Sequence, residues 1–300
     1  MGCSFELCLV MDNAVVAAKV LEEGINEIKR IEALLSEFQT DSTISKININ
    51  AGIKKVSIEP EVMQLLKRAL QISQLSKGYF DITMGPLKKL YKFKNEAFTL
   101  PKQWQINPIL EKVGYRFLEL DEEQGTAFLS KKDMRISLAA IGKGYAADVV
   151  WQKWTNQGYR NGYINASGDL TAFGHNEHER AWKISIANPD NRNHDLFYIP
   201  LNDAAVATSG NYEQYFVHKG IRYSHTIDPK TGKPVTGIKS VSIFSPSAEL
   251  SDALATAVYT MGVSKGISFL NQLPRTHGIL IDHNNQVTLT KQLIYESIPQ

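Results

Sequence analysis

The order in which helical and strand-like patterns follow one another constrains the fold of this chain most. Residues 12–38 repeat apolar side chains at spacings of three, four or seven, which predicts one long helix with a buried stripe of Leu21, Ile25, Ile28, Leu35 and Phe38. Further helices are expected over 62–76, 142–157 and 251–261. Apart from one strand near the start, the strand-like runs cluster after residue 125, so the chain lacks a regular βαβ alternation. We therefore predict an α+β fold with mixed or antiparallel sheets and packed helices.

Composition narrows the class of protein further. The 300 residues are 43% hydrophobic, which suits a globular chain with a sizeable core. A formal net charge of only +2 excludes a nucleic-acid binder that depends on bulk charge, and no apolar run has the length of a transmembrane segment. No linker rich in Pro, Gly or Ser interrupts the chain, so a single domain over residues 1–300 is expected.

The two cysteines offer neither a disulfide framework nor a metal site. Cys3 and Cys8 lie in one strand-like segment at an odd spacing, which points their side chains to opposite faces. We interpret them as small apolar residues.

Two stretches stand out because polar and small residues interrupt an otherwise apolar pattern. In "GYFDITMGPL", Asp81 and Thr83 stand before a Gly-Pro break; they could bind a ligand, or could satisfy backbone groups of a turn. In "SLAAIGKGYAADVV", Lys143 opens a helix, where backbone N–H groups and the positive charge favour an anion. The alternative there is tight helix–strand packing beside an exposed lysine. The spacing is not that of a P-loop.

Two further stretches offer oxygen ligands. In "NASGDL" a strand ends in a Gly turn that carries Asn165 and Asp169, either as ligand contacts or as plain turn residues. In "SDALATAVYTMG", Asp252 and Thr256 are four residues apart on one helix face, and their oxygens suit a hard cation such as Mg²⁺. The alternative is that Ser251 or Asp252 caps the helix and Thr256 bonds back to a carbonyl.

The stretch "YSHTIDPKTGKPV", residues 223–235, predicts a rigid loop with a histidine at its edge. Asp228-Pro229 starts a turn and Thr231-Gly232 continues it. His225 is the side chain best suited to proton transfer near neutral pH, although a loop histidine is often incidental.

Taken together and in this order, these stretches resemble the ApbE-type family of FAD:protein FMN transferases. The resemblance runs from residue 1 to about residue 262 and is carried by "MGCSFE" at Met1, "DSTISKIN" at Asp41, "FDITMGPL" at Phe80, "SLAAIGKGYAAD" at Ser137, "INASGDL" at Ile164, "ATSGNYEQYF" at Ala207, "YSHTIDPKTGKPV" at Tyr223 and "SDALATAVYTMG" at Ser251.

The resemblance implies an activity, a substrate and a partner. Family members use FAD and a divalent metal, usually Mg²⁺, and transfer FMN to a Thr or Ser hydroxyl of an acceptor flavoprotein with release of AMP. Two alternatives stay open: an Mg²⁺-dependent FAD pyrophosphatase that forms FMN and AMP, and an FAD-binding protein without catalysis.

The resemblance also implies roles for particular residues. The metal would be held by Asp252, Thr256 and the carbonyl groups of Ala140 and Ala255. FAD would be contacted by Met1, Phe80, Asp81, Thr83, Ser137, Lys143, Asp169 and the backbone of Thr226. His225, as the candidate base, and Asp228 would lie beside the diphosphate.

The chain departs from the family pattern at three places. Ser137 replaces an Asp, so one FAD contact loses its charge, and Ala139-Ala140 replaces a pair of glycines. "FQTDSTIS" lacks the tyrosine that lies near the isoalloxazine ring, so flavin stacking is weaker or another aromatic side chain serves. Family members commonly carry an export signal before the "MG" element, here residue 1; the chain as given predicts a cytoplasmic protein, and the alternative is an exported lipoprotein whose leader is absent.

Overall fold

The computed structural model describes residues 2–91, 100–211, 215–218 and 220–297, and its contacts divide the chain into two compact units. The first unit comprises Met1–Ile31, Ile141–Tyr212 and Gly237–Gln300, and the second comprises Glu32–Ala140 and Glu213–Thr236. The chain therefore passes between the units four times. The assignment of residues 1–300 to one domain stays a prediction.

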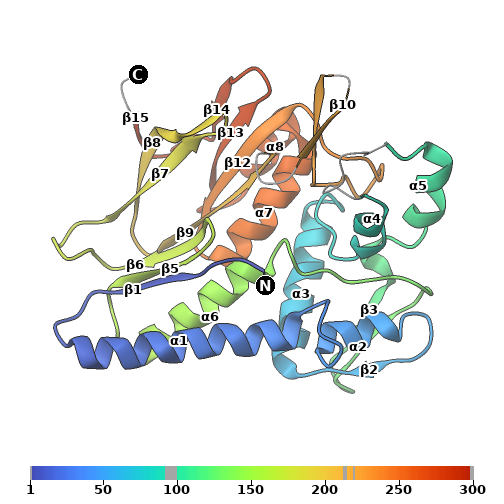
Figure 1. Cartoon of the computed structure of the whole chain (residues 1–300), viewed down its shortest axis with the longest axis horizontal. Helices are drawn as coiled ribbons and strands as arrows, with labels where there is room; N and C mark the ends of the chain where they lie inside the picture. Colours follow the sequence, from blue (N-terminus) through green and yellow to red (C-terminus); the bar gives the residue numbers. More distant parts are fainter. Residues whose placement is uncertain (1, 92–99, 212–214, 219, 298–300) are drawn as a thin grey trace. The chain divides into compact units, whose positions relative to one another are not determined.

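The first unit is built on a seven-stranded sheet in the order β1-β5-β6-β9-β12-β13-β14, with every neighbouring pair antiparallel (Figure 1). Its strands are β1 (Glu6–Leu9), β5 (Gly162–Ala166), β6 (Asp169–Phe173), β9 (Ala204–Gly210), β12 (Ile238–Ser245), β13 (His277–Asp282) and β14 (Val287–Leu289). A second antiparallel sheet has the order β15-β8-β7 and contains β7 (Trp182–Asn188), β8 (Asn191–Leu201) and β15 (Glu296–Ser297).

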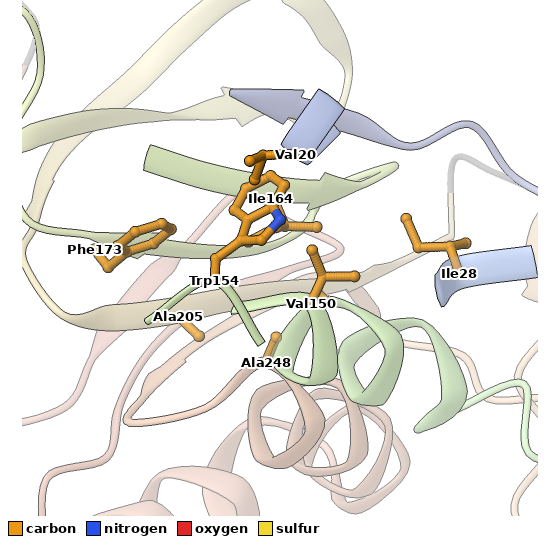
Figure 2. Packing of buried hydrophobic residues seen from close by; sticks show 9 residues of the cluster. Val20, Ile28, Val150, Trp154, Ile164, Phe173, Ala205 and Ala248 are labelled. Carbon is orange, nitrogen blue, oxygen red and sulfur yellow. The ribbon is translucent and has the colours of Figure 1, made fainter. Parts of the chain in front are cut away.

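Helices cover one face of the seven-stranded sheet. They are α1 (Ala14–Leu35, whose last turn is counted in the second unit), α6 (Gly142–Asn156), α7 (Ala248–Met261) and α8 (Val263–Leu270). Trp154 of α6 is fully buried there, beside Val20 of α1, Ile164 of β5 and Phe173 of β6 (Figure 2). The ring centroids of Trp154 and Phe173 are 6.4 Å apart in a tilted arrangement, which is a favourable aromatic geometry.

The other face of this sheet is covered by the three-stranded sheet. Leu170 and Ala172 of β6 pack there with Ile186 of β7 and Ile199 of β8, whereas the next residue, Phe173, faces the helices. Because alternate residues of a strand point to opposite faces, β6 is buried along its whole length. The α+β fold with antiparallel sheets is confirmed.

The second unit holds short helices and two small antiparallel sheets. Its helices are α2 (Thr43–Ile49), α3 (Pro60–Leu75), α4 (Gly85–Leu90), α5 (Gln103–Leu110) and a 3₁₀ turn at Tyr115–Phe117. The sheets are β2-β4-β3, with β2 (Val56–Ser57), β3 (Leu118–Asp121) and β4 (Thr126–Leu129), and the hairpin of β10 (Tyr215–His218) and β11 (Ile221–Ser224).

The first helix differs from its prediction. Its buried face passes through Val20, Gly24, Ile28 and Ile31, and Gly24 lies so close to Trp154 and Leu7 that an added Cβ would be 3.0 and 2.8 Å from their side chains. Ile25 is therefore turned outward. The helix also ends at Leu35, because the Ser36 hydroxyl accepts the backbone N–H groups of Phe38 and Gln39. Phe38 is consequently 87% exposed, and its predicted place in the buried stripe is wrong.

No helix among the described residues is both long and apolar enough to cross a membrane. Cys3 and Cys8 are both free thiols and half-buried.

Candidate functional site

The predicted rigid loop is present in the second unit and is closed by a ladder of backbone hydrogen bonds. Ser224, the last residue of β11, donates its N–H to Val235, and Val235 donates to Thr226, at 3.1 and 2.9 Å. Farther out, Asp228 donates to Lys233 at 2.8 Å, and Ile227 bridges to Pro234. His225 stands at the base of this closed loop, directly after the strand.

Asp228 stabilises the loop from within. Its carboxylate accepts the backbone N–H of Lys230 at 2.9 Å and the hydroxyl of Thr231 at 3.0 Å, which is the hydrogen bonding of an Asx turn. The ammonium group of Lys230 lies 3.7 Å from the ring centroid of Tyr79. The backbone of Thr226 is also engaged, since its N–H bonds to the hydroxyl of Ser224 at 3.1 Å. These contacts support a loop-forming role for Asp228.

Asp81 and Thr83 form a buried polar cluster in the second unit. The carboxylate of Asp81 accepts the N–H and the hydroxyl of Thr83 at 2.7 and 2.6 Å, and the N–H of Tyr115 at 2.7 Å. The Thr83 hydroxyl in turn accepts the N–H of Gly114 at 2.8 Å. Burial raises the pKa of Asp81, although these hydrogen bonds oppose the shift. The cluster matches the turn-forming alternative, and with Phe80 only 1% exposed, direct FAD contacts of these side chains stay a prediction.

A carboxylate stands next to Ser137, where the sequence predicts a lost charge. The Ser137 hydroxyl donates to Oε1 of Glu37 at 2.6 Å and accepts from Nζ of Lys88 at 2.9 Å. Glu37, one hundred residues earlier in the chain, therefore supplies a negative group within one hydrogen bond of position 137. Sequence reasoning missed Glu37 and Lys88, because nothing in their local pattern indicates a long-range contact.

The alanines that replace a pair of glycines are not strained. Neither Ala139 nor Ala140 has a positive φ angle, so the freedom that glycine would add is not needed in this backbone. Ala140 is the last residue of the second unit, and its carbonyl as a metal ligand stays a prediction. Met1, predicted to pack near the flavin, lies outside the described residues.

In the first unit, Lys143 and Asp169 form an ion pair. Nζ of Lys143 lies 2.7 Å from Oδ2 of Asp169, and the Asp169 side chain is 3% exposed. Lys143 is the second residue of α6, and Asp169 opens β6 after the turn at Ser167-Gly168. Two residues predicted from separate motifs are thus brought together. The turn itself is held by Asn165, whose side-chain oxygen accepts the N–H of Gly168 at 2.8 Å.

Asp252 does not cap its own helix. The N-cap of α7 is Ser247, whose hydroxyl accepts the N–H of Leu250 at 3.2 Å, so Asp252 lies in the second turn. Its Oδ2 instead accepts the N–H of Gly144 in the first turn of α6, at 3.3 Å. The predicted capping alternative, with Ser251 or Asp252 at the helix start, is therefore wrong for α7.

Asp148 performs the reciprocal task from α6. Its carboxylate accepts the first two N–H groups of α7, from Ala248 and Glu249, at 2.9 and 2.8 Å, together with the Thr171 hydroxyl at 2.8 Å. Burial raises the pKa of Asp148 to about 6, and the three hydrogen bonds oppose that shift. Each helix thus satisfies the start of the other through one carboxylate. Nothing in the sequence indicated this role, because the Asp lies mid-helix.

The residues around Asp252 suit a hard divalent cation. The Asp252 side chain is buried, and Thr256 follows one turn later on the same face of α7. Thr256 makes no hydrogen bond back to a carbonyl within the part of the chain that the structure describes, whereas the Thr260 hydroxyl bonds to the Thr256 carbonyl at 2.9 Å. The described residues contain no group of three or more His, Cys, Asp or Glu side chains that could hold a metal ion. Any cation here would therefore depend on one carboxylate with hydroxyl and carbonyl oxygens, a hard donor set that suits Mg²⁺, Ca²⁺ and Mn²⁺.

Comparisons with known proteins agree with this architecture. The model of the ApbE family matches residues 1–280. An FAD:protein FMN transferase of Klebsiella pneumoniae (strain 342) is 30% identical over 292 residues, which cover 97% of this chain and 89% of that protein. One from Vibrio cholerae is 29% identical over 282 residues, covering 91% and 84%. The crystal structure of the ApbE protein from Thermotoga maritima superimposes with a TM-score of 0.87 at 29% identity, covering 97% and 94% of the two chains. Since the family model spans nearly the whole sequence, this chain belongs to the ApbE family.

Proposed function

We propose that this protein is an FAD:protein FMN transferase, which moves FMN from FAD to a Thr or Ser hydroxyl of an acceptor flavoprotein and releases AMP. The observation that carries the proposal is family membership over residues 1–280 in a chain that keeps His225 on a stiff loop and Asp252 buried in α7. The relatives from Vibrio cholerae and Klebsiella pneumoniae are named for this activity, and they match this chain along most of their own length.

The proposed reaction assigns the proton to His225. The acceptor hydroxyl oxygen forms a bond to the FMN phosphorus, and the bond from that phosphorus to the bridging oxygen breaks. The bond electrons stay with the AMP phosphate, and the hydroxyl proton passes to the imidazole of His225. The closed loop reduces the freedom of His225, so less entropy is lost when the base and the hydroxyl align.

Asp252 and Thr256 would hold Mg²⁺ in this proposal, with the carbonyl groups of Ala255 and Ala140 as further ligands. When bound, Mg²⁺ would neutralise charge on the diphosphate and the leaving AMP. Because one oxygen of Asp252 accepts the N–H of Gly144, the carboxylate is oriented before any cation binds.

Further residues would bind FAD. Lys143 at the start of α6 adds positive charge to a helix N-terminus, and Asp169 holds its ammonium group in place. In the second unit, Glu37 beside Ser137 would provide the acceptor for a polar FAD group. Phe38, which begins "FQTDSTIS" and is exposed, would be the aromatic that lies near the isoalloxazine ring.

The experiment that tests this function combines the protein with FAD, Mg²⁺ and an acceptor that carries a Ser/Thr-Gly-Ala-Thr type target. We expect intact-mass spectrometry of the acceptor to show one added FMN, with AMP in equal amount, and no adduct after chelation of the metal. Formation of FMN and AMP without an adduct would establish the pyrophosphatase alternative. If FAD is recovered intact in the presence of Mg²⁺ and acceptor, both the transferase and the pyrophosphatase activity are contradicted. The remaining hypothesis is then an FAD-binding protein without catalysis.

A further inference from the structure

The far end of the His225 loop is buried against two helices of the same unit. Gly232 has φ of +68°, and a Cβ added there would lie 2.4 Å from Ile106 of α5 and 3.2 Å from Leu87 of α4. The loop also inserts Ile227 into an apolar cluster that contains Met84, Leu87, Tyr91 and Ile106. The tip is therefore anchored, while His225 stands at the opposite, strand end of the ladder.

One polar contact completes this anchor. The Tyr91 hydroxyl donates to the carbonyl of Gly232 at 2.6 Å, and Tyr91 is 4% exposed. Burial raises the pKa of Tyr91 to about 12, so its hydroxyl stays a donor across the neutral range. Loss of such a buried hydrogen bond is destabilising, because the carbonyl oxygen is then buried without a donor and its desolvation is no longer offset.

The anchor lies on the path that fixes His225. From Gly232 the chain returns through the Asp228–Lys233 and Ile227–Pro234 pairs to Val235, which bonds to Thr226 beside His225. We propose that Tyr91 is a positioning residue, which fixes the loop of His225 through its hydrogen bond to the carbonyl of Gly232. This proposal rests on the function proposed above for its kinetic consequence, but its structural part does not require FAD.

The test uses Tyr91→Phe in the full chain, since this change keeps the ring and removes only the donor. We expect kcat for FMN transfer to fall roughly 10- to 100-fold, the scale on which a small misplacement of a catalytic group acts, with KM for FAD unchanged. In the background of His225→Ala, the same change should have no further effect on kcat, because the loop no longer carries the base.

A second measurement needs neither FAD nor activity. The ¹H–¹³C NMR signal of the His225 ring, identified by its absence in His225→Ala, should be single and narrow in the native protein, and shifted or doubled in Tyr91→Phe. An unchanged signal would overturn the proposal, whatever the value of kcat. A native protein that never transfers FMN would instead refute the proposed function and leave this measurement standing.

Tyr259→Phe is the matched control. Tyr259 is likewise buried and donates its hydroxyl to a backbone carbonyl, that of Ile238 in the first unit, at 3.1 Å. We expect it to lower the melting temperature about as much as Tyr91→Phe does, with kcat and the His225 signal unchanged. Equal losses of kcat in both variants would mean that general destabilisation, and not positioning, explains the effect.

Discussion

His225 and Asp228 are only three residues apart in the same loop. Asp228 accepts two hydrogen bonds from its own turn, so its carboxylate is occupied in holding the loop together. His225 follows β11 directly, at the strand end of the same loop. The structure therefore gives Asp228 a part in shaping the loop, whereas proton transfer by His225 stays a prediction.

His225→Ala should lower kcat for FMN transfer by roughly 10²- to 10⁴-fold, the usual scale for loss of a positioned acid–base group. FAD affinity, measured by fluorescence titration, should change little, because the imidazole acts on the acceptor hydroxyl. His178→Ala is the control, since that side chain is 72% exposed and lies in the other unit. A turnover close to normal in His225→Ala would exclude this residue from proton transfer.

Phe38→Ala should weaken FAD binding by roughly 3- to 10-fold, the equivalent of one aromatic contact, whereas Phe38→Tyr should bind at least as tightly as the native protein. The side chain is 87% exposed, so its loss should leave the melting temperature unchanged. Trp104→Ala serves as the control, because Trp104 is a 69% exposed aromatic residue of the same unit. Equal FAD dissociation constants for native protein and Phe38→Ala would remove Phe38 from the flavin site.

Helices α6 and α7 are coupled through their first turns. Gly144 permits the close approach, because a Cβ at that position would lie 2.1 Å from the carbonyl oxygen of Ala248. The carboxylate of Asp148 in α6 then accepts N–H groups from the first turn of α7, and that of Asp252 in α7 accepts one from the first turn of α6. The helix pair therefore sets the position of Asp252 and Thr256 before any ligand binds.

Asp252→Asn separates the two roles of this side chain. Asparagine can still accept the N–H of Gly144 through its amide oxygen, so the variant should fold with a nearly unchanged melting temperature. It loses the charge that a hard cation prefers, so activity should be largely lost or should require much more Mg²⁺. If the activity and the Mg²⁺ dependence of the variant both match those of the native protein, the hypothesis of a metal site on α7 is wrong.

Asp148 makes stability depend on pH. Its pKa is raised from 3.8 to about 6 in the folded protein, so the proton is held more tightly in the folded state than in the unfolded state. Stability from this group is therefore complete below pH 4 and is lost as pH rises through 6, by about 3 kcal/mol at 1.36 kcal/mol per pKa unit. Urea unfolding from pH 4 to 8 should show that Asp148→Asn loses less stability than the native protein. If the native protein instead becomes more stable relative to Asp148→Asn as the pH rises, the predicted direction of this pH dependence is wrong.

At the scale of the whole molecule, residues 213–236 leave the first unit and return to it at neighbouring strands. Gly210 of β9 pairs with Ser240 of β12, and Asn211 donates its N–H to Lys239 at 2.9 Å, so the two ends of this excursion are held together. If the first unit unfolds, both ends of the segment that carries Ile227 are released, and the second unit loses this restraint on the segment.

We therefore expect the two units to unfold together. Scanning calorimetry should show a single transition whose calorimetric and van't Hoff enthalpies agree, as the prediction of one domain over residues 1–300 requires. Two resolved transitions, or one that changes without the other when Tyr91 is replaced by Phe, would show that the units are separate domains.

The sequence predicted the elements with clear periodicity and the loop with clear turn chemistry. α6 is found close to its expected bounds, and Lys143 opens its helix as predicted. β6 is hard to recognise in the sequence, because burial on both faces removes the alternation that is typical of strands. Ile28 and Leu35 of α1 are buried as predicted, but Gly24, rather than Ile25, faces the core. Local pattern cannot show that a glycine is needed for close packing.

The candidate site was predictable as a set of residue types and not as a set of contacts. The order of the motifs indicated His225, Lys143, Asp169 and Asp252 as candidate site residues. Their supporting partners lie far away in sequence: Asp148 is about one hundred residues from the helix start that it satisfies, and Glu37 is equally far from Ser137. Such pairs depend on the topology of the folded chain, which cannot be predicted from local periodicity.

The position of Tyr91 and Gly232 in the chain has a consequence for synthesis on the ribosome. The donor is made 141 residues before its acceptor, a delay of roughly 7 to 28 s at about 5–20 residues per second. For most of that interval Met84, Leu87 and Ile106 have been synthesised but Ile227 has not, so these side chains lack one apolar neighbour of the folded protein. The loop that carries His225 thus adds Ile227 to an apolar cluster whose other buried residues are synthesised well before it.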